Sequence, residues 1–368
     1  MAGGNLYYNV LQLSDPGVVN PWSVSDVLGA WLVRIRPDDS ATLTPWANLF
    51  PSGTALPTMC EGTFSLPGDP LPWPPTPSSH PPQTPCGTQR PPLNVAPAIG
   101  SDGTIYTVSR AHFHERYGYL LAVNSDLTPK WAASLRGLLN DGCGVTVPFG
   151  TAPVKNVCRT GTTVGVDPAT NDLPAARLLD APTASPTVAP DGVLFGVNTM
   201  YNRGRGHLLK FSSAGQFQTF FDFGWDSTVA IFPHDGTYSV IAKDNHYEGT
   251  FYITQLDPNL QPEWKFENTN TQSCQRNPDD TITCVDVGHT FEWCVNALVV
   301  DANGVAYALS EDGNLYAFGG RGHSGEFTTP LHQVFLNLAL GAAYTPLSVG
   351  PEGTIYTLND GHLFAVSP

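Results

Sequence analysis

The sequence predicts an all-β protein, specifically a β-propeller of four-stranded antiparallel blades. Charged residues make up 13% of the 368 residues, about half of the ~25% found in ordinary globular domains. The chain also contains 36 Gly, 34 Pro and 11% aromatic residues. Many turn formers and aromatics with few charges favour short strands joined by tight turns. A repeated hairpin motif and its spacing provide the second and third observations.

The repeat is clearest where the word GTIYT occurs twice, at 103–107 and 353–357. Each copy follows an apolar run and a polar turn residue, and precedes an apolar and aromatic strand. An Asp-Gly or Asn-Gly pair between alternating runs is a strong hairpin signal, because the tight turn requires positive φ. Five segments share this pattern: 97–108, 186–197, 230–241, 298–309 and 347–358. Their turn residues are Asp102, Asp191, Asp235, Asn303 and Glu352, each followed by Gly.

Two further elements complete each unit. A third strand alternates apolar and polar residues, as in GYLLAVNSD and GNLYAFGG, which is typical of half-buried strands. A fourth strand closes several units with a tryptophan, at Trp46, Trp131 and Trp264, and we interpret these residues as equivalent core positions. The N-terminal residues fit the second to fourth strands of a first unit.

The spacing of the turns predicts a period of about 45 residues, which is typical of propeller blades. We predict six recognisable repeats and a degenerate seventh within 162–180. All lie in one β-propeller domain, 1–368, with loop insertions at about 51–92, 136–165 and 268–292. Because the first unit lacks an inner strand and the last an outer one, we expect the termini to meet and close the ring.

The seven cysteines predict three local disulfides and one buried thiol, Cys294. The pairs Cys60–Cys86, Cys143–Cys158 and Cys274–Cys284 each bracket a loop-like insertion. A metal site is the weaker interpretation, since no CxxC or HxxxH spacing occurs. Disulfides require an oxidising compartment, so we expect a periplasmic or extracellular location. The start, MAGGNLYYNV, lacks the basic and apolar regions of an export signal, and we expect the signal to be missing from this sequence.

The charge excludes two kinds of partner. The net charge is −15, with 17 basic residues, which argues against nucleic acid because phosphate binding requires a basic stripe. An anionic lipid surface is disfavoured for the same reason. Since no apolar run approaches ~18 residues, we predict no membrane span. A protein partner or a small-molecule ligand remains.

These repeats resemble those of the quinoprotein, or pyrroloquinoline-quinone-like, β-propeller superfamily. The resemblance rests on the apolar–Asp-Gly–x–Ile/Leu–Tyr turn, the LYAF and LLAVN strands and the closing Trp, and covers about four-fifths of the chain. It implies a propeller fold, but the superfamily contains both dehydrogenases and assembly scaffolds, so fold alone does not decide function. Quinone-dependent members typically carry an adjacent Cys-Cys pair. This chain has none, which disfavours a quinone cofactor.

The candidate site lies in loops that depart from the repeat. In a propeller, the loops between second and third strands and the segments leading into each blade gather on one face. Aromatic and polar groups converging there are what a pocket requires, although a solvated loop face is the alternative. The candidate ligand-binding residues are His112, His114, Glu115, Tyr201, Arg203, Trp225, Asp226, His246, Glu292 and Trp293.

Three kinds of chemistry could use these residues. His112 and His114, with His246, could hold a transition metal. Asp226 and Glu292 could act as an acid/base pair. Calcium could bind oxygen ligands assembled from several loops. No cofactor is firmly implied. We therefore expect an extracytoplasmic platform that binds a ligand or a protein, and the alternative is a propeller enzyme, an oxidoreductase or hydrolase, with its site at the channel mouth. Trp225 and Trp293 would face the channel, either at the site or as packing plugs.

Overall fold

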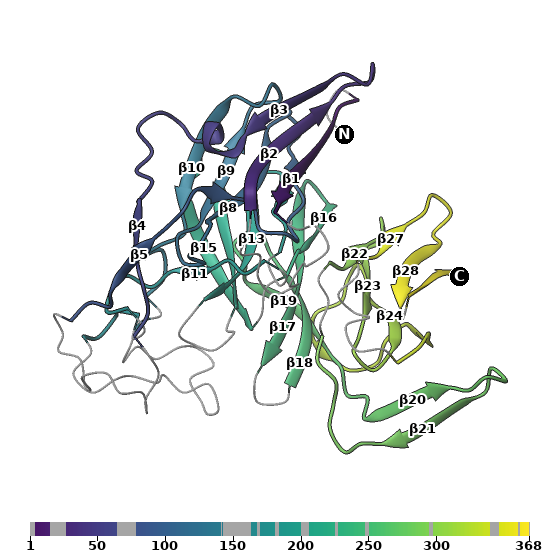
Figure 1. Ribbon diagram of the computed structural model, residues 1–368. Coiled ribbons are helices and arrows are strands. Elements are labelled where there is room, and N and C mark those ends of the chain that lie inside the picture. The colour runs from purple at the N-terminus through teal and green to yellow at the C-terminus, as the bar shows by residue number, and fades with distance from the viewer. Residues whose placement is uncertain are drawn as a thin grey trace. The chain divides into compact units, whose positions relative to one another are not determined.

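The computed structural model describes the chain in two compact units, Met1–Gln218 and Thr219–Pro368 (Figure 1). The described residues are 4–14, 27–64, 79–140, 142, 163–167, 170–180, 184–199, 206–224, 227–246, 250–293, 297–338, 346–359 and 361–367. Within them the structure is almost entirely β, and the one helical element is the 3-10 turn η1 (Trp46–Leu49). The predicted all-β class is confirmed.

Three antiparallel sheets of the predicted blade type begin in unit 1. Blade 1 has the order β1-β2-β3, blade 2 the order β7-β8-β9-β10, and blade 3 the order β12-β13-β14-β15. The boundary between the units falls inside β15. The strand bounds are β1 (Leu6–Leu13), β2 (Val27–Ile35), β3 (Ala41–Pro45), β7 (Ala98–Ile99), β8 (Ile105–Ala111), β9 (Tyr119–Val123), β10 (Pro129–Ser134), β12 (Thr187–Ala189), β13 (Gly192–Thr199), β14 (Gly206–Ser212) and β15 (Phe217–Gly224).

Unit 2 contains three more such sheets. Blade 4 has the order β16-β17-β18-β19, blade 5 the order β22-β23-β24-β26, and blade 6 the order β27-β28-β29. The bounds are β16 (Ala230–His234), β17 (Thr237–His246), β18 (Thr250–Leu256), β19 (Pro262–Glu267), β22 (Val299–Val300), β23 (Val305–Leu309), β24 (Asn314–Gly319), β26 (His332–Phe335), β27 (Ser348–Val349), β28 (Ile355–Asn359) and β29 (His362–Val366). The six repeats recognised in the sequence therefore correspond to the six blade sheets described above.

Short strands from outside the repeat attach to the blades. β6 (Gln89–Arg90) pairs with the end of β8, and β11 (Ala176–Arg177) pairs with the end of β13. β25 (Gly325–Phe327) leaves blade 5 and lies parallel to β19 as a fifth strand of blade 4. Neighbouring blades 4 and 5 are thus joined by a backbone ladder as well as by side chains.

The described part of 162–180 forms no separate sheet. Asp167 and Asp172 make one bridge, Arg136 and Ala175 another, and Ala176–Arg177 joins blade 3 as β11. The predicted degenerate seventh blade is therefore not seen among the described residues. The turn-forming residues that suggested a hairpin do make a turn, because Asn171 adopts positive φ of 58°, but the strands on either side belong to other sheets or do not form.

Four of the five polar-Gly turns carry glycine at positive φ, as the sequence predicts. Gly103, Gly304 and Gly353 have φ near +80°, and Gly236 has φ of 77°, a conformation in which Gly carries no steric cost. Gly192 does not adopt positive φ, so the turn at Asp191 departs from the prediction. In the first three turns the glycine N–H donates to the carbonyl three residues earlier, as from Gly304 to Asp301 at 3.1 Å. The same turn geometry joins third and fourth strands, where Leu127 and Leu260 occupy the positive-φ position instead of Gly.

The core lies between adjacent blades, and the tryptophans that close the fourth strands contact the neighbouring blade. Trp46 donates through Nε1 to Ser109 Oγ at 2.9 Å, and Trp131 donates to the Ser213 carbonyl at 2.9 Å. Trp264, buried in blade 4, packs where a Cβ on Gly319 of blade 5 would come within 2.7 Å of its ring. The interpretation of these residues as core positions is confirmed for Trp46 and Trp264, whereas Trp131 is half-buried.

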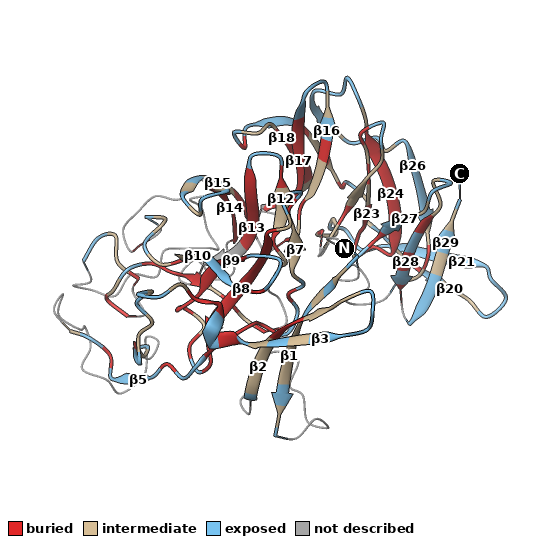
Figure 2. Ribbon diagram, turned by 90° about the horizontal axis from the view of Figure 1, so that it is seen from above, coloured by how far each residue is buried: buried red, intermediate tan, exposed pale blue. Residues whose placement is uncertain are grey.

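Burial concentrates on the middle strands, as Figure 2 shows for β8, β13 and β24. All seven residues of β8 are buried, as are all six of β24. By contrast β21 (Ile282–Asp286), which pairs only with β20 (Gln272–Arg276), is exposed along its whole length. These two strands form the predicted insertion between blades 4 and 5.

Two of the three predicted disulfides are present, Cys60–Cys86 and Cys274–Cys284. The first links β4 (Met59–Glu61) to the residue after β5 (Gln83–Pro85), and the second joins residues that lie opposite each other in β20 and β21. Cys143, Cys158 and Cys294 lie outside the described residues. No helix in the described part of the chain is long and apolar enough to cross a membrane.

Candidate functional site

The candidate loop 109–118 covers the last residues of β8 and the connection to β9. The insertion closed by Cys60–Cys86 holds it from outside the repeat. The His112 N–H donates to the Thr88 carbonyl at 3.0 Å, and the Phe113 N–H donates to the Cys86 carbonyl at 3.0 Å. Cys60 and Cys86 are fully buried. The insertion therefore fixes the loop backbone, and His112 and His114 are buried beneath it rather than exposed on a solvated loop.

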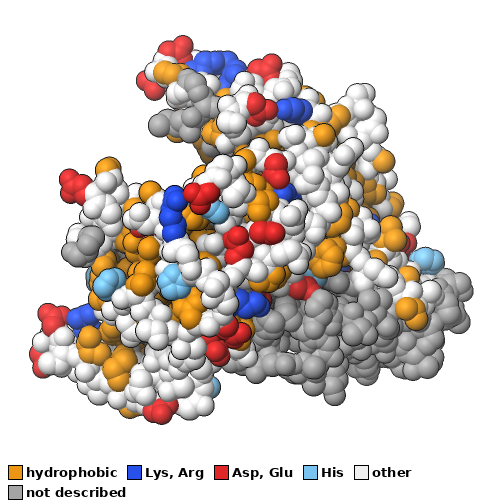
Figure 3. Space-filling model, turned by 180° about the vertical axis from the view of Figure 1, so that it is seen from behind, with side chains coloured by type: hydrophobic (Ala, Val, Ile, Leu, Met, Phe, Trp, Pro, Cys, Tyr) orange, Lys and Arg blue, Asp and Glu red, His pale blue; other side chains and the backbone are white. Residues whose placement is uncertain are grey.

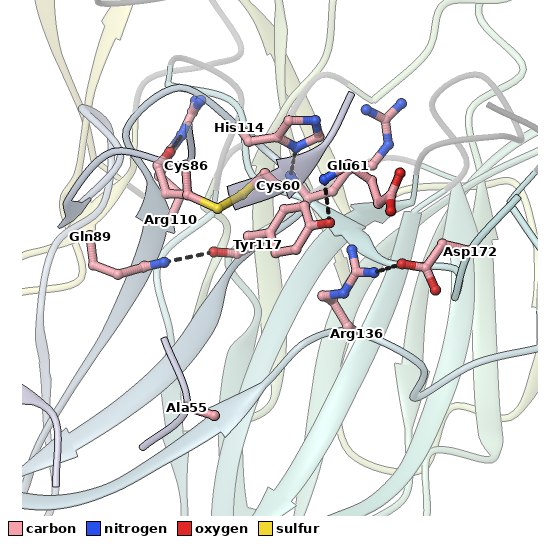
Figure 4. The surroundings of a disulfide bond; sticks show 12 residues. Ala55, Cys60, Glu61, Cys86, Gln89, Arg110, His114, Tyr117, Arg136 and Asp172 are labelled. Carbon is pink, nitrogen blue, oxygen red and sulfur yellow. Dashed lines mark hydrogen bonds and ion pairs between the residues drawn. A yellow bond between two sulfur atoms is a disulfide. The ribbon is translucent and has the colours of Figure 1, made fainter. Parts of the chain in front are cut away.

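Tyr117 connects this loop to three surrounding segments (Figure 4). Its hydroxyl accepts the Glu61 N–H at 2.8 Å, and its carbonyl accepts Gln89 Nε2 at 3.1 Å. The Arg136 guanidinium lies 4.1 Å from the ring centre, and the His114 ring meets it edge-on at 5.1 Å. A cation over an aromatic face contributes about 0.5–2 kcal/mol, so Tyr117 helps to position two ionisable groups.

Five arginines and four carboxylates gather around this loop, and we call them the arginine cluster. Its members are Arg90, Arg110, Glu115, Arg116, Arg136, Asp167, Asp172, Arg177 and Asp180. They come from β6, from the end of β8 and its loop, from the end of β10 and from the segment 163–180. All of these segments belong to unit 1.

The deepest carboxylate is bound by two arginines. Arg90 binds Asp180 with both terminal nitrogens, at 2.6 and 2.9 Å, and Arg110 adds a third contact at 3.4 Å. Asp180 and Arg90 are almost fully buried. A buried pair of this kind is costly to break, because either partner alone would leave an uncompensated charge. Arg136 likewise binds Asp172 at 2.6 Å. These pairs hold the insertions against blade 2.

Arg116 is also buried, and its contacts with carboxylates are longer. It is 3% exposed, its Nε lies 3.3 Å from Asp167 Oδ2, and its Nη1 lies 3.9 Å from Glu115 Oε1. Among the described residues its Nη2 has no hydrogen-bond partner. Buried polar groups usually find partners, and a guanidinium offers five donors and no acceptor. Such an unmet donor in a cluster of charges marks a candidate ligand contact.

The cluster keeps His114 neutral. Burial, followed by the positive charge of Arg116, lowers the pKa of His114 to about 4. The imidazole Nδ1 accepts the Arg116 N–H at 3.4 Å, which also requires an unprotonated nitrogen. Burial lowers the pKa of Arg110 to about 10, which still leaves that guanidinium charged at neutral pH.

The metal hypothesis finds no support in the described residues. No three His, Cys, Asp or Glu side chains among them are placed to hold a metal ion. His114 faces arginines, which repel a cation. The side chain of His246, the third expected ligand, lies outside the described residues, as do Tyr201, Arg203, Trp225 and Asp226. The proposed acid/base pair, which includes Asp226, likewise stays a prediction.

In unit 2 the two candidate residues that the structure describes, Glu292 and Trp293, lie beside the end of β17. Asn245 binds the backbone of Trp293 on both sides, donating from Nδ2 to its carbonyl at 3.0 Å and accepting its N–H at 3.3 Å. The indole is fully buried, donates to the Phe251 carbonyl at 3.2 Å and packs on Phe266. Trp293 therefore serves as core packing between blades 4 and 5. Glu292 beside it is half-buried.

One grouping in blade 4 has the connectivity of a catalytic triad. His234 Nε2 lies 2.8 Å from Ser239 Oγ, and its Nδ1 lies 3.2 Å from Asp235 Oδ2. Ser239, however, is fully buried and donates to Glu263 Oε2 at 2.6 Å. A nucleophile must reach its substrate, and its proton must face the base. This arrangement therefore links β16, β17 and β19 and is not a hydrolase site.

Two of the cavities in the described part of the chain lie away from the arginine cluster. One, of about 700 Å³, lies in unit 1 between Pro51–Ala55 and the strand β10, and includes Tyr119 and Lys130. The other, of about 560 Å³, lies between blades 5 and 6 and is mainly apolar, with Tyr307, Leu331 and Val366 in its wall. Neither contains a member of the arginine cluster. On the face shown in Figure 3, acidic and basic side chains are interspersed with uncharged ones.

The sequence located the loop but missed most of its partners. His114, Glu115 and Arg116 follow from the departure of 109–118 from the repeat. Asp167, Arg177 and Asp180 come from a segment without repeat character, and nothing in the sequence indicates which loop it covers. One signal was available. Arg110 follows apolar and small residues in a strand that the repeat predicts to be buried, and a buried guanidinium needs a buried carboxylate as its partner.

Comparisons with known proteins add little to this geometry. No protein-family model matches the chain, and no curated protein matches it. Among solved structures, a protein of unknown function from Bacteroides caccae gives a TM-score of 0.32 at 10% identity, over 96% of this chain and 82% of that one. A quinohemoprotein alcohol dehydrogenase from Comamonas testosteroni also gives 0.32, at 12% identity, over 73% of this chain and 51% of the enzyme. The WD40 domain of Sif2 gives 0.28 at 11% identity, over 72% and 69%. Because these TM-scores are so low, neither the details of the fold nor an activity can be inferred from these structures.

Proposed function

We propose that this protein is an extracytoplasmic binding platform of propeller blades, and that its ligand contacts the arginine cluster at loop 109–118. The observation that carries the proposal is the guanidinium of Arg116, which is buried on a fixed loop with Nη2 unpaired among the described residues. Two disulfides support a location outside the reducing cytoplasm.

The physical basis is preorganisation. A loop fixed by a disulfide, by Tyr117 and by buried ion pairs loses little conformational entropy on binding. Loops on a rigid β scaffold are where binding residues usually lie. A binding role agrees better with these residues than a catalytic one does, because His114 is neutral and buried and already accepts a backbone N–H.

A thermal-shift screen tests the proposal. Purified protein is melted with a library of anionic, neutral and cationic small molecules, and compounds that raise Tm are retested on Tyr117→Leu and on Tyr252→Leu. Tyr252 lies in blade 4, far along the chain, and serves as the control. We expect at least one compound to raise the Tm of the wild type and of the control but not of Tyr117→Leu. If no compound raises Tm, or if Tyr117→Leu responds as the wild type does, the proposal fails.

A further inference from the structure

The side chain of Glu115 is surrounded by guanidinium groups that it does not saturate. Arg177 Nε donates to Glu115 Oε1, and Arg116 Nη1 lies 3.9 Å from the same oxygen. The pKa of Arg110 is also affected by Glu115 and by Arg177, so this third guanidinium lies within electrostatic range. One carboxylate therefore faces three positive groups, of which Arg110 and Arg116 have other anionic partners in Asp180 and Asp167.

Several donors at this point remain available. Among the described residues, Arg116 Nη2 has no hydrogen-bond partner, and Arg177 is bonded only through Nε, which leaves its two terminal nitrogens unused. The Arg177 side chain is 35% exposed and that of Glu115 is 20% exposed. Solvent therefore reaches the group from the Arg177 side, while Arg116 forms its buried end.

The backbone holds these two arginines in a fixed relation. Arg177 lies in β11, where it pairs with Asn198 of β13. The next residue, Leu178, donates its N–H to the Glu115 carbonyl at 2.9 Å. Arg116 follows Glu115 directly. Backbone hydrogen bonds thus tie Arg177 to β13 on one side and the residue after it to the turn that carries Arg116 on the other.

From this arrangement we propose that the site binds an oxyanion, a carboxylate or phosphate group, on the unused nitrogens of Arg177 and Arg116 beside Glu115. This inference rests on the proposed binding function and names its ligand class. Guanidinium donors in a fixed fork match two oxygens of one carboxylate or phosphate group. Glu115 is the acceptor at this point and is already bonded to Arg177, so a cation would meet the positive charge of the surrounding guanidinium groups.

Titration calorimetry at low ionic strength tests the assignment, with sodium succinate and inorganic phosphate as separate probes and sodium chloride as the reference. We expect saturable binding of at least one probe. Arg177→Gln should weaken it at least about tenfold, because a charge-assisted hydrogen-bonded pair is lost. Glu115→Gln should tighten binding at least about twofold, because a competing negative charge is removed.

The matched control is Arg36→Gln, in which the lost guanidinium lies outside the arginine cluster and donates to Ser40 Oγ in the turn after β2. Its affinity should stay within about twofold of the wild type, since charges farther away are screened. The near-ultraviolet circular dichroism of each variant verifies folding. Arg177 is partly exposed, so its replacement leaves the buried pairs intact.

The outcomes separate the two proposals. Saturable binding that Arg177→Gln leaves unchanged, or that Arg36→Gln weakens equally, overturns the oxyanion site. No saturable heat with either probe overturns it as well. If the thermal-shift screen nevertheless yields a neutral ligand that depends on Tyr117, the binding platform stands without the oxyanion. The probe that binds more tightly identifies a carboxylate or a phosphate as the natural group.

Discussion

At the scale of single residues, the least usual feature is leucine in a left-handed turn. Leu127 and Leu260 have φ of 72° and 61° and are almost fully buried. The left-handed conformation costs an L-residue roughly 1–2 kcal/mol, whereas burying a leucine contributes about 1.5–3 kcal/mol. Packing therefore outweighs backbone strain, and the turns between third and fourth strands keep a side chain where glycine would be unstrained.

This balance predicts an inverted order of stability at Leu260. Both Leu260→Ala and Leu260→Gly lose the buried side chain and should destabilise the protein by about 2–5 kcal/mol. Only glycine also removes the strain, so Leu260→Gly should be more stable than Leu260→Ala by about 1 kcal/mol. Urea denaturation measures the difference. At Leu256, buried in β18 without positive φ, the alanine variant should be the more stable, and the same order at both positions would contradict the argument.

His114 predicts a pH dependence of stability. Its pKa in the folded protein is about 4, lowered first by burial and then by Arg116, with Glu115 opposing and Arg136 and Arg110 adding to the effect. The unfolded chain, with a pKa near ~6.5, binds a proton that the folded protein does not. The free energy of unfolding should therefore rise by about 3 kcal/mol from pH 4 to 6.5 and then level off. Urea denaturation of His114→Gln should show this slope reduced, and an unchanged slope would show that other groups cause it.

At the scale of elements, the β20-β21 hairpin depends on its disulfide. A two-stranded ribbon is marginal in water, and every residue of β21 is exposed. Its main ties to blade 5 are the bonds from Arg276 to the carbonyls of Phe335 and Leu336. Closing a loop of this size stabilises a folded segment by roughly 3 kcal/mol. The ribbon should therefore persist only while Cys274–Cys284 is intact.

Hydrogen exchange tests this dependence. In a Cys274→Ser, Cys284→Ser double variant, the amides of 272–286 should exchange at least about tenfold faster, since most of the stabilising link is lost. Amides of the buried strands β17 and β18 should keep their rates. Equal protection of the hairpin in the variant would mean that the Arg276 contacts suffice.

The sequence predicts the parts of the fold that repeat along the chain. The blades could be predicted because most of the five tight turns need Gly at positive φ and each middle strand needs apolar residues, so the same residue pattern recurs along the chain. The insertions carry no such constraint. Arg177 and Asp180 take part in the arginine cluster through tertiary pairing with Glu115, Arg90 and Arg110, and single-sequence patterns hold no information on partners so distant along the chain.

At the scale of the whole molecule, closure of the six blades into one ring stays a prediction. A compact globular chain of 368 residues has a radius of gyration of about 21 Å. Small-angle X-ray scattering on the monomer should give this value if the ring closes. A substantially larger radius, with a scattering profile of two tethered bodies, would show that the units stay apart.

The tryptophans that reach from one blade to the next have a spectroscopic consequence. Trp46, Trp264 and Trp293 are shielded from water at contacts between neighbouring sheets, so their emission should shift to the red when a contact opens, even if every hairpin survives. Trp131, half-buried over Gly215, should respond first. These four of the eight tryptophans thus report the contacts between blades, whereas far-ultraviolet circular dichroism reports the strands. A difference between the two unfolding midpoints would measure how independently the blades separate.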